Sequence, residues 1–405
     1  MMSMTKKARD IIFLTSHPVP YHVPTLQALA TYKDIDLTVL YCSDTGIHAV
    51  NDPGFGAAVK WDLPLLEGYH YRFLKNVSPR PDVSTFWGLI NFGIVPLLVR
   101  QKPSAVIVHG YYRFTNWLAI VTCLLARIPI LLRGESTLLF QPRNPIKRWL
   151  KDRIMRFLVS HSAGFLSVGT ENTKFYQHYD APEKLIFHAP YTTNNDLFIS
   201  KDKQASSQRQ AIRNQYTIAD NHVVFLFVAK LIERKRPLEL IHAWERIPPE
   251  LHSRGALLFV GSGNLEQALK QYVHDHKLKN IHFAGFINQS NLPDYYNASD
   301  VFVLPSEKDM WGIVVNEAMC YGKPIITTDK VGSATDLIDE SNGFIYPSGD
   351  IEALANHLLF FLNNPGKAST MGTNSFKKIS KWGPSETAQG IHRAILHITQ
   401  HGSQT

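Results

Sequence analysis

Residues 300–326 read "DVFVLPSEKDMWGIVVNEAMCYGKPII", and their pattern predicts the fold. A short apolar run ends at Leu304 and Pro305, a polar loop follows, and helical spacing begins near Gly312. A second apolar run, "PIITTD", comes directly after that helix. A strand, a helix and another strand in this order form a βαβ unit, which places the two strands parallel in one sheet.

The same alternation continues on both sides of this stretch. Toward the N-terminus the expected strands are "DIIFLTS", "IDLTVLYC", "AVIVHG", "IPILLRGE", "GFLSVG", "HVVFLFVAK", "ALLFVG" and "IHFAGF". Helices are expected at 236–247, 264–277, 291–298 and 313–321, and near 350–363 and 384–399. Only "YTTNNDLFISKDKQASSQRQ", residues 191–210, is polar without periodicity, and we interpret it as a linker or crossover.

The length of 405 residues favours two cores over one. We expect two doubly wound α/β domains facing across a cleft, with boundaries at 1–200 and 201–382. Residues 383–405 are expected to form a helix that crosses back to the first domain. In such sheets, ligands bind at the carboxyl ends of the strands.

Charge and cysteine content narrow the class of protein. The net charge is +8, and nearly all of the excess lies in residues 1–200, which suggests an anionic partner such as a membrane surface, a nucleic acid or a charged substrate. The three cysteines form no CxxC motif, so neither a zinc framework nor a disulfide scaffold is indicated, and a cytoplasmic location is expected. No apolar run reaches the roughly 20 residues of a spanning helix.

Two carboxylates and a glycine in the opening stretch suggest a ligand. Asp309 precedes the predicted helix and Glu317 lies within it, so both could bind hydroxyl groups. Gly312 starts the helix, and the free N–H groups of a helix N-terminus bind anions. A sugar nucleotide carries the matching groups: a hexose, a diphosphate and a ribose. Glu317 could instead be a surface carboxylate, but its apolar neighbours predict a buried helix in which a ligand or a cation satisfies its charge.

A pair of lysines forms the second candidate element, in "FVAKLIERKRPLELIHAW", residues 227–244. Lys230 lies at a strand end and Lys235 precedes a helix, so the two cations could hold a diphosphate and stabilise a departing nucleotide. The alternative is a solvated basic turn, since Arg234 and Arg236 are adjacent.

Together these residues resemble a known family. The chain is similar to the retaining glycosyltransferases called glycosyl transferases group 1, or family 4, which have the GT-B fold. The E-x7-E pattern of that family is matched from Pro305 to Pro324, with Asp309 in place of the first Glu. Its G-R-L-x-x-x-K element is matched by "AKLIERK", with Lys230 in place of Arg. "GSGNLEQAL" and "IHFAGFINQSNLPDYYNASD" follow the order of the family, whereas its glycine-rich first loop is replaced by "SHPVPYHVP".

The resemblance implies roles for individual residues. Glu317 would hold the ribose hydroxyls, Asp309 would contact the donor sugar, and Phe286 would line the base site. The diphosphate would be bound by Lys230, Lys235, Gly312, Ile313 and Val314. The groups expected to take part in catalysis are Asp309, His109 and Lys235.

The first half offers candidates for the acceptor. His109 ends the strand "AVIVHG", and a histidine in this region of the family contacts a sugar; a structural histidine is the alternative. Glu135 in "RGES" follows the next strand, where it is either an acceptor contact or an exposed charge at a strand end. His17 and His22 flank the first loop and could face the same region.

A basic amphipathic stretch occupies residues 143–157, "RNPIKRWLKDRIMRF". Ile146, Trp149, Leu150, Ile154 and Phe157 recur at helical spacing. One interpretation is a helix that packs on its own sheet with a basic outer face. The other is docking to anionic lipid at the inner face of the cell membrane, where a lipid-linked acceptor would be found. Nucleic acid is not expected, because no binding module accompanies the charge.

The sequence therefore predicts a hexosyltransferase-type enzyme that moves a sugar from a nucleotide-sugar donor to a hydroxyl acceptor with retention. The resemblance implies that the acceptor is a glycan or a lipid-linked molecule in polysaccharide or glycolipid biosynthesis. No metal site and no cofactor are expected, since no HExxH motif or spaced histidine cluster occurs. Two alternatives stay open: a nucleotide-sugar epimerase on the same fold, and a non-enzymatic protein that binds anionic membranes and has a degenerate donor site.

Overall fold

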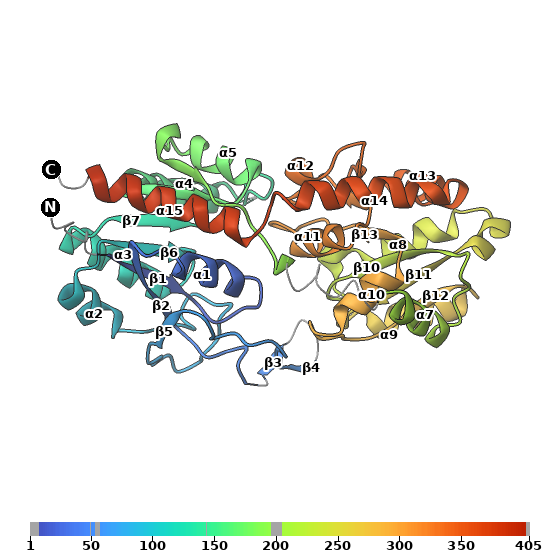
Figure 1. Ribbon diagram of the computed structural model, residues 1–405, viewed down its shortest axis with the longest axis horizontal. Coiled ribbons are helices and arrows are strands. Elements are labelled where there is room, and N and C mark those ends of the chain that lie inside the picture. The colour runs from blue at the N-terminus through green and yellow to red at the C-terminus, as the bar shows by residue number, and fades with distance from the viewer. Residues whose placement is uncertain (1–7, 49, 53–56, 143, 196–204, 402–405) are drawn as a thin grey trace, which may run out of the picture. The chain divides into compact units, whose positions relative to one another are not determined.

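The computed structural model describes residues 8–48, 50–52, 57–142, 144–195 and 205–401. The chain divides into two compact units (Figure 1). Unit 1 comprises Met1–His48, Pro64–Thr192 and Gly383–Thr405, and unit 2 comprises Ala49–Leu63 and Thr193–Trp382. The segment Ala49–Leu63, which we expected in the first domain, is thus grouped with unit 2.

Unit 1 is built on a parallel sheet of seven strands in the order β5-β2-β1-β6-β7-β8-β9. Its strands are β1 (Arg9–Thr15), β2 (Ile35–Tyr41), β5 (His70–Phe73), β6 (Ala105–His109), β7 (Ile130–Arg133), β8 (Gly164–Ser167) and β9 (Ile186–His188). Its helices are α1 (Val23–Ala30), α2 (Ile94–Gln101), α3 (Phe114–Ala126), α4 (Pro145–Ser160), α5 (Thr170–His178) and α15 (Pro384–His401). The chain winds outward from β1 in both directions, which is the doubly wound arrangement.

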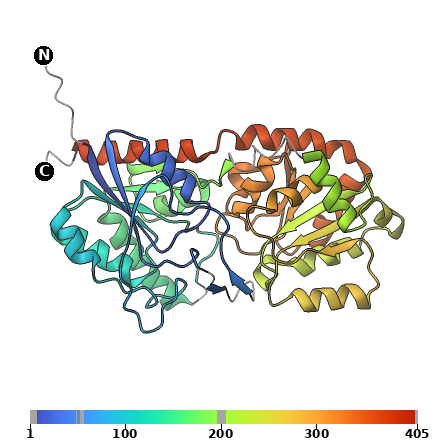
Figure 2. The same ribbon diagram turned by 60° about the horizontal axis from the view of Figure 1, so that its bottom comes forward.

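The last helix described, α15, belongs to unit 1 and lies beside α1, as both ribbon views show (Figures 1 and 2). It also contacts β8 and β9. Two polar contacts fix it: Arg9 donates to Thr399 Oγ1 at 2.8 Å, and the His392 ring nitrogen lies 3.0 Å from Asp34. Gly390 makes the close approach feasible, because a Cβ there would lie 1.9 Å from the carbonyl oxygen of His188.

Unit 2 contains a parallel sheet of six strands in the order β12-β11-β10-β13-β14-β15. Its strands are β10 (Val223–Val228), β11 (Gly255–Val260), β12 (Ile281–Phe283), β13 (Val301–Leu304), β14 (Ile325–Thr328) and β15 (Gly343–Tyr346). Its helices are α7 (Ala205–Gln215), α8 (Pro237–Glu245), α9 (Glu266–Asp275), α10 (Leu292–Ala298), α11 (Ile313–Cys320), α12 (Ala334–Leu337), α13 (Ile351–Asn363) and α14 (Pro365–Ile379). A small antiparallel pair, β3 (Val50–Asp52) and β4 (Ala57–Val59), also belongs to this unit.

Each unit has its own hydrophobic core. The central strands read as continuous apolar runs because helices cover both faces of a parallel sheet. All six residues of β10, "VVFLFV", are buried, and Trp244 of α8 is completely enclosed against them. These rigid sheets fix the loops at their carboxyl edges.

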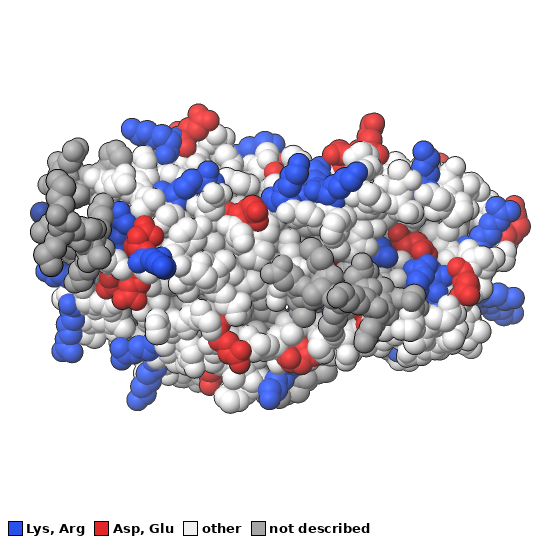
Figure 3. Space-filling model, in the orientation of Figure 1, with Lys and Arg blue, Asp and Glu red and all other residues white. Residues whose placement is uncertain are grey.

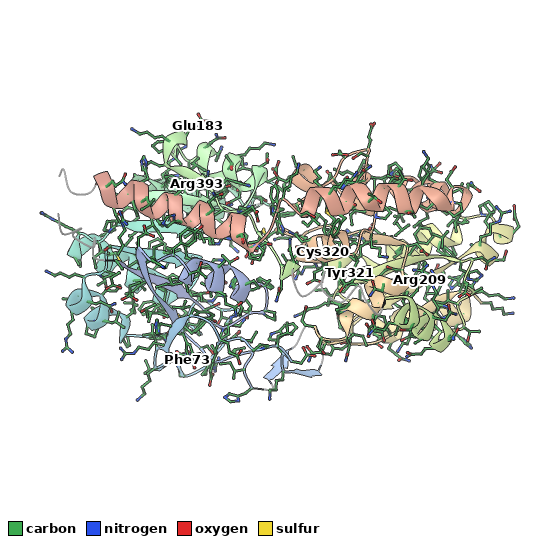
Figure 4. All side chains as sticks on the ribbon, viewed as in Figure 1. Phe73, Glu183, Arg209, Cys320, Tyr321 and Arg393 are labelled. Carbon is green, nitrogen blue, oxygen red and sulfur yellow. The ribbon has the colours of Figure 1, made fainter. Side chains whose placement is uncertain are left out.

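The linker predicted at 191–210 is wrong in its last part, because α7 begins at Ala205. The arginines of α7 explain why a polar stretch is helical. Arg213 is almost fully enclosed, and both Arg209 and Arg213 pair with Asp300. Figure 4 labels Arg209 on α7. These ion pairs attach α7 to the end of α10. Residues 196–204 lie outside the described part of the chain.

Candidate functional site

The strand order of unit 2 places its reversal point between β10 and β13. β11 and β12 extend the sheet to one side of β10, and β13, β14 and β15 extend it to the other side. The loops after two such neighbouring strands run in opposite directions, and a crevice forms between them at the carboxyl edge of the sheet. Ligands bind in this crevice in doubly wound sheets. The two loops here contain the residues singled out in the sequence, 229–236 after β10 and 305–312 after β13.

A glycine-rich turn holds the loop after β10 in place. A Cβ at Gly261 would lie 2.0 Å from the oxygen of Ala229, and one at Gly263 would lie 2.4 Å from the oxygen of Leu231. Leu231 N–H also donates to the Ser262 carbonyl at 2.9 Å. The "GSG" motif therefore lets two neighbouring loops pack backbone to backbone, which leaves little freedom for the segment that carries Lys230.

The structure brings Lys235 and Asp309 together, as an ion pair between the loops after β10 and β13. Both side chains are largely shielded from water, with exposed fractions of 11% and 15%. Backbone contacts fix Asp309 from the other side: its N–H donates to the Lys330 carbonyl at 3.1 Å, and its carbonyl accepts from Gly332 N–H at 3.0 Å. Two residues expected to contact different parts of the donor thus hold each other.

Gly312 is the residue before the first turn of α11, in a left-handed conformation with φ +82° and ψ +57°. A Cβ at this position would lie 2.7 Å from Val331 Cγ1, so a side chain there meets both strain and a clash. Ile313 and Val314 are the first two helical residues, and their N–H groups have no acceptor within the helix. The turn that we predicted to bind an anion thus lies at the same edge as the Lys235–Asp309 pair.

Glu317 lies in the middle of α11 and is buried, with 3% of its surface exposed. Its Oε2 accepts a hydrogen bond of 2.8 Å from the Tyr296 hydroxyl of α10. Burial raises the pKa of Glu317 to about 7, and the Tyr296 hydrogen bond opposes part of that rise. The sequence predicted a ligand or a cation as its partner and missed Tyr296, although "DYYNASD" lies in a segment that we had compared with the family.

Phe286 follows β12 at the same carboxyl edge of the sheet and is half-buried. The preceding Gly285 has φ +72°, and its carbonyl accepts from Gly261 N–H at 2.8 Å. Just beyond, Asn288 donates to the Lys60 carbonyl at 2.7 Å, which attaches the segment 60–63 to unit 2. The loop with Phe286 is therefore linked to the glycine turn that supports Lys230.

In unit 1 the reversal point lies between β1 and β6, and three histidines are found there. His17 and His22 follow β1, and His109 ends β6; the rings of His22 and His109 are 4.6 Å apart. Burial is the main cause of their low pKa values, with nearby arginines contributing: about 4 for His17, about 3 for His109, and well below 6.5 for His22. All three rings are therefore neutral at physiological pH.

Glu135 follows β7 next to this histidine cluster. Its Oε1 accepts a 2.7 Å hydrogen bond from the Tyr191 hydroxyl and lies 4.0 Å from His109 Nε2. The structure thus brings together His109 and Glu135, the two residues expected to contact the acceptor. Tyr191, which also lies 3.3 Å from His22 Nε2, was missed because it is 56 residues away in the chain.

Helix α4 corresponds to the predicted amphipathic stretch and packs on the core of unit 1, but not through the five apolar residues named from the sequence. Trp149 is 62% exposed, and Ile146, Leu150, Ile154 and Phe157 are exposed as well. The buried face consists of Met155, Leu158 and Val159. Arg143 lies outside the described residues.

Metal-binding clusters and membrane-spanning helices are both absent from the part of the chain that the structure describes. Within the described ranges, no group of three or more His, Cys, Asp and Glu side chains is arranged to hold a metal ion. Every helix described falls short of the length and apolarity that a membrane crossing requires.

Residues 208–378 match the family model for glycosyl transferases group 1. Unit 2 contains a glycosyl transferases group 1 domain. This confirms the resemblance inferred from "AKLIERK" and from the Asp309–Glu317 spacing, and both motifs lie inside the matched residues. The residues that the structure brings together around β10 and β13 therefore belong to the glycosyl transferases group 1 domain.

Curated relatives resemble the same region. D-inositol 3-phosphate glycosyltransferase 2 of Catenulispora acidiphila is 26% identical over 200 residues, which is 47% of this chain and 47% of that protein. The capsular polysaccharide biosynthesis glycosyltransferase CapM of Staphylococcus aureus is 25% identical over 164 residues, 40% of this chain and 43% of CapM. The chain thus matches less than half of the length of these curated relatives.

Solved structures resemble almost the whole chain. HepE of Anabaena, in complex with UDP, has a TM-score of 0.71 and 18% identity, covering 96% of this chain and all of HepE. WaaG, a glycosyltransferase involved in lipopolysaccharide biosynthesis, has a TM-score of 0.65 and 16% identity, covering 95% of this chain and 99% of WaaG. These likenesses confirm the expected GT-B fold, with one Rossmann-like sheet in unit 1 and another in unit 2.

Proposed function

We propose that this protein is a glycosyltransferase that moves a sugar from a nucleotide-sugar donor to a hydroxyl acceptor. The observation that carries the proposal is the arrangement at the carboxyl edge of β10 and β13. There Lys235, Asp309 and the N-terminus of α11 meet inside the region that matches the family. The likeness to HepE, whose structure contains UDP, supports a nucleotide as part of the donor.

Each group has a chemical task in this proposal. Lys230 and Lys235 neutralise the diphosphate, and the N–H groups of Ile313 and Val314 donate to its oxygens. Asp309, which pairs with Lys235, contacts the sugar hydroxyls. Glu317 accepts hydrogen bonds from the ribose.

The proposed reaction is a front-side displacement with retention at the anomeric carbon. The bond from the anomeric carbon to the phosphate oxygen breaks, and the acceptor oxygen bonds to that carbon from the same side. The acceptor proton passes to the departing phosphate oxygen. Catalysis then comes mainly from positioning and from the lysine charges, which stabilise the negative charge of the leaving group. His109 and Glu135 of unit 1 are the proposed acceptor contacts.

A thermal-unfolding panel with UDP, GDP, ADP and CMP tests the donor site. A nucleotide at about 100 times its dissociation constant adds about 2.7 kcal/mol to the free energy of unfolding of the form that binds it. We expect one nucleotide to raise the melting temperature of the wild type, and the rise to be lost in Lys230→Ala. Lys367→Ala, at an exposed lysine of α14, is the matched control and should keep the full rise.

Activity assays separate the alternatives. Release of an altered sugar nucleotide without any acceptor would favour the epimerase. Failure of every nucleotide to stabilise the wild type would overturn the donor site and favour a binding protein.

We also propose that transfer needs no metal ion, because two lysines and a helix N-terminus can carry the diphosphate charge. Treatment of the purified enzyme with EDTA should leave the turnover rate unchanged. A loss of turnover that Mg²⁺ or Mn²⁺ restores would contradict this part of the proposal.

The exposed face of α4 supports attachment to an anionic membrane, where a glycolipid or lipid-linked polysaccharide precursor would serve as acceptor. Trp149 and Phe157 project into solvent beside the basic side chains of Lys147, Arg148 and Arg153. This combination favours the boundary of an anionic bilayer. On the face seen in Figure 3, by contrast, basic and acidic side chains are interspersed.

Co-sedimentation with vesicles tests the attachment. The wild type should bind vesicles that contain phosphatidylglycerol, and binding should weaken with salt. The double variant Trp149→Ser, Phe157→Ser should bind at least about tenfold more weakly, since burial of each aromatic ring contributes about 1.5 to 3 kcal/mol. Ile345→Ser, which removes a partly exposed apolar residue of unit 2, should bind like the wild type. Equal binding by the double variant would contradict attachment through α4.

A further inference from the structure

Arg133 is a buried arginine, and most of its N–H donors have no acceptor among the described residues. It is the last residue of β7 and only 4% exposed. Its Nη1 donates to the Ala189 carbonyl at 2.9 Å, and its guanidinium carbon lies 5.9 Å from the Tyr191 ring centre. No described carboxylate forms an ion pair with it. A guanidinium has five N–H donors, and burying its charge without a partner is costly.

Arg213 in unit 2 shows how this protein supplies hydrogen-bond acceptors and a counter-charge to a buried arginine that has a structural role. Arg213 is 1% exposed and donates to the carbonyls of Ala298, Ala219, Asp220 and His222. Its Nη2 also pairs with the Asp300 carboxylate at 2.7 Å. Arg133 is almost as deeply buried and has one neutral acceptor. The contrast indicates that a group from outside the chain accepts the remaining hydrogen bonds of Arg133.

The surroundings of Arg133 contain several donors and one carboxylate, Glu135, whose charge opposes the lowering of the Arg133 pKa by burial. Glu135 forms no ion pair with Arg133 in the described part of the chain, and its Oε1 accepts from the Tyr191 hydroxyl. His22 and His109 are neutral, and the buried Nδ1 of each has no partner in the described part of the chain. Arg113, the residue before α3, donates its Nε to the Val83 carbonyl and forms no ion pair with a described carboxylate. The positive charges of Arg113 and Arg133 both help to lower the pKa of His109, so both charges lie near the His109 ring.

Arg133 and His22 also line one small cavity, together with Phe13, Tyr21 and Tyr191. The cavity has room for about one water molecule, so it can take a single oxygen atom of a larger group. It lies at the carboxyl edge of the unit 1 sheet, beside the reversal point between β1 and β6.

We propose that Arg133 and His22 form an oxyanion site, and that the acceptor bound by unit 1 carries a phosphate or a carboxylate group. One oxygen of that group enters the cavity and accepts from the Arg133 guanidinium, while the remaining oxygens lie toward His109 and Arg113. The assignment of the anion to an acceptor rests on the proposed function, whereas the oxyanion site itself does not.

Isothermal titration calorimetry of the full chain tests the site, with inorganic phosphate and acetate as probes. Phosphate could also bind the lysines of unit 2, so the titration is repeated in Lys230→Ala, which should retain the unit 1 site. Arg133→Lys should weaken binding at that site at least about tenfold, because an ammonium cannot reproduce the two-pronged donation of a guanidinium. Arg80→Gln, at an exposed arginine of unit 1, should bind like the wild type.

A second variant covers the case in which Arg133→Lys fails to fold. His22→Gln keeps a polar side chain at the same cavity and should weaken binding several-fold. The proposal is overturned if each probe binds to Arg133→Lys and to His22→Gln as tightly as it binds to the wild type. It is also overturned if Lys230→Ala binds neither probe.

The stronger of the two probes assigns the group on the acceptor, phosphate or carboxylate. The same samples are titrated with the nucleotide that stabilises the wild type, and its affinity should not depend on Arg133. Nucleotide binding together with phosphate binding that is indifferent to Arg133 would overturn this inference alone. Phosphate binding that needs Arg133, in a protein that no nucleotide stabilises, would overturn the proposed function and leave the oxyanion site standing.

Discussion

Two features of the structure require a glycine at position 312: its left-handed backbone conformation and the closeness of Val331. Replacing it with Ala places a side chain at φ +82° and 2.7 Å from Val331 Cγ1. We expect Gly312→Ala to lower the free energy of unfolding by about 1 to 3 kcal/mol and to weaken nucleotide binding. Urea unfolding and the nucleotide panel measure both effects.

Gly366→Ala is the matched control for this change. Gly366 lies in the first turn of α14, and a Cβ added there would have no neighbour within 4 Å among the described residues. This substitution should be neutral or stabilise the protein by up to about 1 kcal/mol. Equal destabilisation by both substitutions would show that Gly312 has no special requirement.

Glu317 should make the ligand-free protein less stable as the pH rises. The folded state keeps a proton on Glu317 up to a pKa of about 7, whereas the unfolded chain releases it near 4.5. The folded state therefore binds more protons between these values, and stability falls from about pH 4.5 to about pH 7, by up to about 3 kcal/mol. Glu317→Gln should remove this fall in urea unfolding at pH 5 and pH 8, and Glu340→Gln, at an exposed position, should retain it.

At the residue scale, the sequence predicted the main members of the site but not the partners that complete them. Lys235 and Asp309 could be found because each lies in a recognisable local motif. Their direct pairing depends on the sheet order, which brings loops 74 residues apart together. Tyr296 and Tyr191 have no motif of their own, and only the packing of α10 on α11 and of β9 beside β8 places their hydroxyls.

At the scale of elements, the close packing of α15 on β9 depends on Gly390. A Cβ at this position would overlap the His188 carbonyl, so Gly390→Ala must push the helix away from the sheet. We expect a loss of about 1 to 3 kcal/mol and faster hydrogen exchange in α1, which contacts α15. Gln389→Ala changes the exposed neighbour on the same helix and should stay within about 0.5 kcal/mol of the wild type. Unchanged exchange in α1 for Gly390→Ala would contradict this account of the packing.

The elements that the sequence predicted well are those with long apolar runs or clear helical spacing. The strand expected at "HVVFLFVAK" and the helix expected at 313–321 correspond to β10 and α11. Helix α14 was missed because its sequence, "PGKASTMGTNSFKKI", is mostly polar and small. Its buried face relies on residues such as Gly372, which contacts Gly322 backbone to backbone and gives no hydrophobic signal.

At the scale of the whole molecule, the two units should respond to acid differently. Between a pKa of about 3 and 6.5, folded His109 binds fewer protons than it does in the unfolded chain, and His17 behaves alike down to about 4. Unit 1 should therefore lose stability as the pH falls below about 6.5, by about 1.4 kcal/mol per pH unit for each such histidine. The trend is opposite to the one that Glu317 imposes on unit 2.

Hydrogen exchange followed by mass spectrometry separates the two responses. Between pH 7 and pH 5, peptides from β1 and β6 should lose protection once the intrinsic exchange rate has been corrected. His109→Gln should reduce that loss, and it should leave the protection of peptides from β10 and β13 unchanged. Equal acid sensitivity in wild type and His109→Gln would contradict the assignment.

The fold as a whole was the most predictable level, because alternation of strands and helices is repeated throughout the chain. The membership of Ala49–Leu63 in unit 2 could not be predicted, since nothing local distinguishes that excursion from an ordinary loop of the first sheet. Its contacts, such as that of Lys60 with Asn288, join residues 228 positions apart.

The return of α15 to unit 1 has a consequence for the order in which the protein is made. Most of unit 1 is synthesised before unit 2, but the helix that covers β8 and β9 is synthesised only after the residues of unit 2. At 5 to 20 residues per second, the ribosome needs about 10 to 40 s to translate the segment between Thr192 and Gly383. During that interval the nascent first sheet exposes apolar surface that α15 later covers, so unit 1 cannot finish folding until unit 2 has been made.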